Sequence, residues 1–279
     1  MATDPYRADR EWQRYEGTPQ RDLFRQLRIR FLRRHAVDGG WAIDVGSGPG
    51  RFTPFLGGPS SRRVALDLSR AMLDEIPRRL DTYSPETVGS IDRVRADSVQ
   101  PPFPPRTFRE VAVLGNTLGF AGEKSPGILT ACEALVAPGG TLILEIAPGP
   151  GEISRYLGRL PPRAVGRLLE APPKAVIPRI DREGFLTERP RHEGRSFRRW
   201  GALEVIRRWK PLGWEAVEVL SVAPVLGPDN ACAEAVAREP RAWNHLLEIE
   251  EFVGRREERW TTAAAVLLAD QRAPLKGHA

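Results

Sequence analysis

The sequence predicts an α/β protein with a doubly wound, mostly parallel sheet, and two observations carry this prediction. Short apolar runs alternate with helix-like segments through residues 38–148. This alternation is typical of strand–helix–strand units, whose parallel sheet is covered by helices on both faces. The first apolar run ends in an acid followed by glycines at every second position, a pattern typical of a strand that turns into a ligand-binding loop.

Residues 18–35 are expected to form a helix ahead of the first strand. Thr18 is a suitable N-cap, and Pro19 suits the first helical position. One side of this helix is an apolar stripe of Leu23, Leu27 and Phe31, and the other side carries solvated arginines at 21, 25, 28 and 33. Residues 1–37 are therefore predicted to be an N-terminal helical segment or lid.

Seven strands are expected in the rest of the chain, over 41–45, 62–69, 91–98, 109–120, 141–148, 214–224 and 261–272. Helices are expected after Ser69, where Pro77 would end or kink the helix, and over 126–136, 201–210 and 230–252. Prolines and charges interrupt the alternation after the fifth strand. The predicted units are a core over 38–148, an inserted cap over 149–200, the remaining core over 201–273 and a tail over 274–279.

The composition is that of a globular protein, with 41 % hydrophobic and 28 % charged residues. No apolar run approaches the roughly 18 residues of a membrane-spanning helix, and the charged start does not resemble a secretory signal. Two cysteines, Cys132 and Cys232, cannot form a disulfide framework, and no CxxC pair predicts a metal site. A cytoplasmic location without a membrane partner is expected. The net charge of +6 comes mainly from arginines spread along the chain, which indicates a solvated surface rather than a nucleic-acid footprint.

The segment AIDVGSGPGRF at 42–52 carries the clearest chemical signal. Asp44 lies near the end of the strand, and Gly46, Gly48 and Gly50 alternate after it. Glycines allow positive φ angles and a close approach of a ligand to the backbone. The spacing is GxGxG rather than the GxGxxG of dinucleotide sites, and the chain has no GxxxxGK[ST] phosphate loop.

Acids also end the next two expected strands. Asp67 ends the second strand, where a carboxylate can accept hydrogen bonds from both ribose hydroxyls. Asp97 ends the third strand and is followed by Ser98, within reach of a purine amino group. Together with the glycine loop, these residues predict a nucleoside ligand that lies across the carboxyl edge of the sheet.

The chain resembles the class I S-adenosylmethionine-dependent methyltransferases. The resemblance rests on AIDVGSGPGRF, VALDLS, RADS, AVLGNTLGF and APGGTLILE, in the family's order and spacing. It covers about residues 38–148 well and the part from 200 onward loosely. It implies a seven-stranded sheet with an antiparallel last strand, and S-adenosylmethionine as cofactor.

The resemblance also implies roles for single residues. Gly46, Ser47, Gly48 and Gly50 would cup the methionine part, Asp44 would support this loop and the amino group, and Asp67 with Leu68 would bind the ribose. Asp97 and Ser98 would flank the adenine. Gly115 and Asn116 would lie beside the transferable methyl, and Tyr15, like Trp12, would close over the cofactor.

Methyl transfer is an in-line displacement, in which alignment of the reacting groups matters more than a strong base. Glu145 and His192 are the candidate catalytic residues, because Glu145 ends the fifth strand near the cofactor and His192 lies in the expected cap. GNTLGF stands where many nucleic-acid and protein amine methyltransferases have an NPPY-type motif, so a small-molecule N or O acceptor is expected. The alternatives are methylation of RNA, which a pI near 9.8 favours, and a non-catalytic S-adenosylmethionine-binding protein.

Overall fold

The computed structural model describes residues 8–80, 83, 91–147, 200–222, 225, 231–260 and 265–272. The expected cap at 149–200, apart from Trp200, and the tail at 274–279 lie outside these residues. Among the described helices, none combines the length and the apolar character needed to cross a bilayer.

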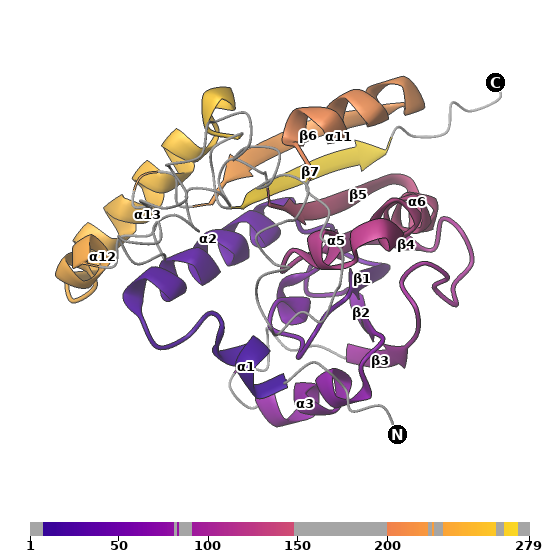
Figure 1. Cartoon of the computed structure of the whole chain (residues 1–279), viewed down its shortest axis with the longest axis horizontal. Helices are drawn as coiled ribbons and strands as arrows, with labels where there is room; N and C mark the ends of the chain where they lie inside the picture. Colours follow the sequence, from indigo (N-terminus) through magenta and orange to yellow (C-terminus); the bar gives the residue numbers. More distant parts are fainter. Residues whose placement is uncertain are drawn as a thin grey trace, which may run out of the picture.

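The seven strands form one sheet in the order β3-β2-β1-β4-β5-β7-β6 (Figure 1). The first five strands along the chain are parallel to one another, and β7 is antiparallel to both β5 and β6. This confirms the predicted fold class, including the antiparallel last strand. The strands are β1 Trp41–Val45, β2 Arg62–Asp67, β3 Ile91–Arg95, β4 Phe108–Val113, β5 Val136–Ile146, β6 Trp214–Ser221 and β7 Val266–Arg272.

One face of the sheet is covered by α2 Pro19–His35, with α12 Ala231–Val236 and α13 Pro240–Gly254 beside it (Figure 1). Small side chains on this face, those of Ala42, Ala112 and Ala269, let the helix layer pack close to the strands. The 3₁₀ turn η1 Thr53–Phe55 contacts α2, and α3 Arg70–Leu80 packs on β2 and β3. Thr18 caps α2, as predicted, by accepting a hydrogen bond from the amide of Arg21.

The opposite face is covered by α5 Thr117–Phe120, α6 Ser125–Leu135 and α11 Ala202–Trp209. Tryptophans attach the later part of the chain to this layer. The indole of Trp200 donates a 2.6 Å hydrogen bond to Ser125 Oγ, and Trp209 stacks on Trp214 with 5.5 Å between ring centroids. The remaining short elements are α1 Ala8–Gln13, η2 Gly122–Lys124, η3 Lys210–Leu212 and η4 Glu257–Arg259.

Two elements differ from the sequence expectations, each for a local backbone reason. The strand expected over 109–120 ends at Val113, because Gly115 and Asn116 adopt left-handed conformations that no strand contains. The single helix expected over 230–252 is two helices, because the residue before Pro240 is disfavoured in helical geometry. Pro77 lies inside α3, which ends less than one turn later at Leu80.

Asp270 on β7 is a buried carboxyl group within the sheet. It is 2 % exposed, and its Oδ2 atom has no hydrogen-bond partner in the described part of the chain. Burial raises the pKa of Asp270 to about 7. The folded state therefore retains a proton that the unfolded chain loses near pH 4, so this group destabilises the fold increasingly as the pH rises toward 7.

Replacing this carboxyl group with an amide removes that pH dependence. Relative to the wild type, Asp270→Asn should gain roughly 1.4 kcal/mol of unfolding free energy per pH unit between about pH 5 and pH 7. Urea unfolding at several pH values measures the difference. Asp92→Asn, at an exposed position on β3, is the control. Parallel stability curves for Asp270→Asn and the wild type would contradict this assignment.

Candidate cofactor and acceptor site

The carboxyl ends of β1, β2, β4 and β5 meet at one rim of the sheet, and the glycine loop follows β1 there. The amides of Gly46 and Ser47 both donate to the carbonyl of Leu66, at 2.8 and 3.0 Å, which fastens the loop to β2. Gly46, Gly48 and Gly50 all have positive φ angles, between 54° and 76°. This backbone path explains the alternating glycines of the sequence.

The three glycines serve different purposes. A Cβ at Gly46 would collide with the side chain of Thr117, and one at Gly50 would lie 2.7 Å from Ile76. Both positions are therefore needed for close packing. A Cβ at Gly48 would meet no atom of the described residues within 4 Å, so within that part of the chain this position borders open space. Gly48 is the glycine of this loop at which a ligand can approach the bare backbone.

Asp67 lies directly beside this open position. Its Oδ2 atom accepts a 2.8 Å hydrogen bond from the amide of Gly48, and Oδ1 accepts one from the amide of Ser69. The structure thus brings together two predicted site residues that are 19 positions apart. Leu68, the next predicted contact, is 61 % exposed, so its side chain is available to a ligand.

Asp97 and Ser98 follow β3 at the same rim, and both are partly exposed. The amide of Ala96 donates to the carbonyl of Asp67 at 3.2 Å, which joins the ends of β3 and β2. Asp97 accepts hydrogen bonds from the amide of Val99 and from Lys124 Nζ. The Val99 bond and the Lys124 contact lower the pKa of Asp97, so the group is a carboxylate at neutral pH.

Asp44 is 2 % exposed beneath the glycine loop. Its Oδ2 atom accepts a 2.7 Å hydrogen bond from the hydroxyl of Thr53, which joins the end of β1 to η1. Burial raises the pKa of Asp44 to about 7, the negative charge of Asp67 adds to this effect, and the Thr53 bond opposes it. This bond ties the strand that precedes the glycine loop to the turn that follows it.

Gly115 and Asn116 form a left-handed turn at the end of β4, with φ angles of 64° and 63°. A Cβ at Gly115 would likewise meet none of the atoms that the structure describes within 4 Å, so this turn also borders space that they leave open. Side chains from distant elements bind both polar groups of Gly115. Its amide donates to Glu145 Oε2 at 3.0 Å, and its carbonyl accepts a 3.3 Å bond from Arg14 Nη1.

Glu145 is also paired with Arg28, a residue whose part in the site the sequence did not reveal. Nε and Nη2 of Arg28 donate to the two carboxylate oxygens, at 2.9 and 2.6 Å, and both side chains are about 95 % buried. The expectation that Arg28 is solvated is therefore wrong. The sequence did contain a signal of burial, because Arg28 directly follows Leu27 of the apolar stripe. A buried arginine requires a charged or hydrogen-bonding partner.

Burial alone would raise the pKa of Glu145, but the charge and hydrogen bonds of Arg28 outweigh it, and the pKa lies below its usual value. Glu145 is thus an engaged carboxylate close to Gly115. His192, the other candidate catalytic residue, lies outside the described residues.

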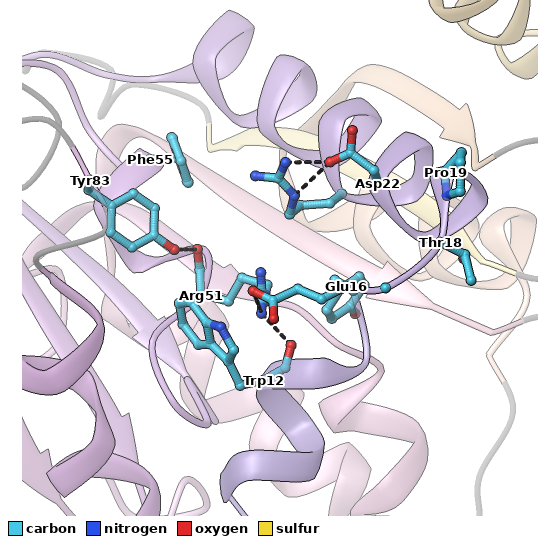
Figure 2. Close-up of a pocket in the computed structure, with 11 residues that line it drawn as sticks. Trp12, Glu16, Thr18, Pro19, Asp22, Arg51, Phe55 and Tyr83 are labelled. Carbon is cyan, nitrogen blue, oxygen red and sulfur yellow. Dashed lines mark hydrogen bonds and ion pairs between the residues drawn. The ribbon is translucent and has the colours of Figure 1, made fainter. Parts of the chain in front are cut away.

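A cavity of about 530 Å³ opens between the α1–α2 connection and η1 (Figure 2). Two ion pairs contribute to its wall, Arg25 with Asp22 and Arg51 with Glu16. Arg51 also donates to the carbonyl of Trp12, and its buried Nε atom has no partner in the described part of the chain. The aromatic lining consists of Trp12, Tyr15, Phe55 and Tyr83.

Tyr15 links this cavity to the Gly115 turn. Its ring lines the cavity and lies 5.2 Å from the guanidinium carbon of Arg28. It also packs edge-on against Phe52, two residues beyond Gly50. The chain before α2 therefore lies against the loop after β1 and close to the Arg28–Glu145 pair.

Comparisons with known proteins agree with this geometry. Residues 42–140 match the family model described as "Methyltransferase domain". No curated protein matches the chain. One similar structure is a chain of the complex between the Haloferax volcanii Trm112 methyltransferase activator and a protein described as a methyltransferase. It has 17 % identity, a TM-score of 0.56, and coverage of 98 % of this chain and 96 % of that chain.

A second similar structure is named as the [4+2]-cyclase SpnF. It has 12 % identity, a TM-score of 0.51, and coverage of 90 % of this chain and 81 % of that chain. At such identities the structural likeness concerns the fold alone, and the family match concerns the segment that contains the glycine loop and Asp67. Residues 42–140 are therefore similar to a methyltransferase domain, and the chain has the same fold as these solved structures.

Proposed function

We propose that this protein transfers a methyl group from S-adenosylmethionine to a small-molecule N or O acceptor. The observation that supports this proposal best is the pairing of Gly48 with Asp67 at the rim of the sheet, beside space that no described side chain fills. A second open position at Gly115 lies at the end of the neighbouring strand β4. An elongated nucleoside can extend between backbone at one end and carboxylates at the other.

The residues present suit such a cofactor. Gly46, Ser47, Gly48 and Gly50 would hold its methionine part, and Asp67 and Leu68 would hold its ribose. Each carboxylate oxygen of Asp67 accepts a backbone amide, from Gly48 or Ser69, and a carboxylate oxygen can accept more than one hydrogen bond, including one from a ribose hydroxyl. Asp97 and Ser98 would flank the adenine.

When bound, S-adenosylmethionine supplies a methyl group on a positively charged sulfur that is open to in-line attack. The contribution of the chain is to orient the two reactants and exclude water, which is worth roughly 7–11 kcal/mol in well-aligned systems. Tyr15 and the Gly115–Asn116 turn supply these surfaces. A carboxylate engaged by Arg28 is a weak proton acceptor, which favours a nitrogen nucleophile that loses its proton to solvent. His192 remains the candidate base for a hydroxyl acceptor.

The cavity at the α1–α2 connection is the proposed acceptor pocket. Its volume of about 530 Å³ lies within the range of small-molecule sites, and aromatic walls with a few charged groups are typical of them. Through Tyr15 it adjoins the elements that shape the Gly115 turn. A pocket of this kind supports a small acceptor more strongly than an RNA, which would require a continuous basic surface.

A pair of glycine variants tests the cofactor site. Gly48→Ala and Gly39→Ala introduce the same methyl group at positive φ angles of 54° and 75°, and neither Cβ would lie within 4 Å of another described residue. The backbone strain is therefore similar in the two variants, and only Gly48 borders the proposed site. Titration calorimetry with S-adenosylhomocysteine should give at least tenfold weaker binding for Gly48→Ala and unchanged binding for Gly39→Ala. Equal affinities in the two variants would reject this site.

The acceptor class can be measured with methyl-labelled S-adenosylmethionine. The purified protein is incubated in parallel with the low-molecular-weight fraction of a cell extract and with total RNA. Label should appear in the small-molecule fraction. Arg25→Gln should lower that transfer when the acceptor is limiting and leave the affinity for S-adenosylhomocysteine unchanged. The reason is that Arg25 lines the proposed acceptor pocket and is not part of the proposed cofactor site.

Arg70→Gln is the matched control for Arg25→Gln, since Arg70 forms a similar intrahelical ion pair with Asp74 on α3. Label in RNA instead would contradict the acceptor class. Binding of S-adenosylhomocysteine without transfer to either fraction would identify a non-catalytic binder.

A further inference from the structure

Arg28 is the cation of a buried pair that reaches from α2 to the rim of the sheet. All three of its donor nitrogens are engaged: Nε and Nη2 by Glu145, and Nη1 by the carbonyl of Phe24 at 2.8 Å. The guanidinium is thus fixed by its own helix on one side and by β5 on the other. A planar fork of this kind holds a carboxylate in one orientation, which a lysine ammonium cannot do.

The orientation of Glu145 determines where the Gly115 amide is held. Oε2 accepts a bond from Arg28 and another from the amide of Gly115. In a regular strand this amide would bond to a neighbouring strand, but here a side chain supplies the acceptor. The bond holds Gly115 in the left-handed conformation that begins the turn.

Asn116 makes this support necessary. A non-glycine residue at a φ angle of 63° is less stable than in the ordinary regions, and such residues persist where surrounding contacts determine the backbone. Asn116 follows Gly115 and is 91 % buried. Two consecutive left-handed residues therefore rely on bonds that Glu145 and Arg14 make to the Gly115 peptide groups.

We propose that Arg28 is a positioning residue for the transfer reaction: by orienting Glu145, it holds the left-handed Gly115–Asn116 turn in the shape that the methyl-bearing end of the cofactor requires. This inference rests on the proposed function for the identity of the ligand. Arg28 itself contacts no reactant. The same pair links the turn to Tyr15, whose ring packs on the guanidinium, so the acceptor side and the cofactor side share one support.

The chain contains a matched control on the same helix. Arg34 also donates through Nε and Nη2 to the two oxygens of a strand glutamate, Glu218 on β6, both at 2.9 Å. Arg34 and Glu218 have no contact with Gly115 in the described structure. Arg28→Lys and Arg34→Lys therefore both remove the two-pronged guanidinium contact while keeping the positive charge. Only Arg28 is linked to Gly115, through Glu145.

The experiment compares these two variants with the wild type by two measurements. Hydrogen exchange followed by mass spectrometry reports the protection of the peptide around Gly115 without any ligand. Calorimetry reports the affinity for S-adenosylhomocysteine. Arg28→Lys should lose protection around Gly115 and bind roughly tenfold more weakly, whereas Arg34→Lys should match the wild type in both measurements.

A merely structural role for Arg28 would give a different result. In that case Arg28→Lys would lower the melting temperature but leave exchange around Gly115 and the affinity of the folded protein unchanged, which would overturn the proposal. Glu145→Gln covers the case in which Arg28→Lys fails to fold, because it keeps an oxygen acceptor but weakens the fork, and the same two measurements apply. If the wild type does not bind S-adenosylhomocysteine, the proposed function fails, and exchange around Gly115 still decides whether Arg28 holds the turn.

Discussion

The ion pair between Arg28 and Glu145 is the constraint on which the rim of the sheet depends. Removing two charges from water is costly, and the loss of either partner alone would leave an uncompensated buried charge at a cost of about 3–5 kcal/mol. The pair therefore fastens α2 to β5 in a single geometry. Because the same carboxylate holds Gly115, the position of a surface helix and the shape of a ligand-facing turn are coupled.

The glycine loop at the same rim is shaped by its backbone rather than by buried charge. Gly46 and Gly50 allow the loop to pack against Thr117 and Ile76, and Gly48 leaves its own surface bare. Asp67 holds that bare peptide and at the same time supplies a carboxylate at the rim. Gly46 and Gly50 thus serve the packing of the loop, and Gly48 is the position at which the proposed ligand would meet its backbone.

The parallel sheet and its order follow from features that are local in sequence. The central strands are short apolar runs, and the acids at strand ends reach the same rim because parallel strands end at one edge. The predictions for Gly48 and Asp67 came from such local patterns, and the structure brings these residues together. Arg28 was missed because its partner lies 117 positions away, and a basic residue on an amphipathic helix is usually solvated. The break at Val113 was missed because apolar residues continue past it, while positive φ angles at Gly115 and Asn116 end the strand.

The place of β7 in the sheet has a consequence for how the chain assembles. β6 pairs with β7 alone, and β7 pairs with β5, so β6 has no neighbour in the sheet until residues 266–272 are in position. During synthesis β6 leaves the ribosome about 50 residues before the strand that joins it to the sheet. The five parallel strands can assemble earlier, while the last two must add together in a late step. Until that step, β5 exposes an unpaired edge. During this interval, the nascent chain is most susceptible to strand pairing with other proteins.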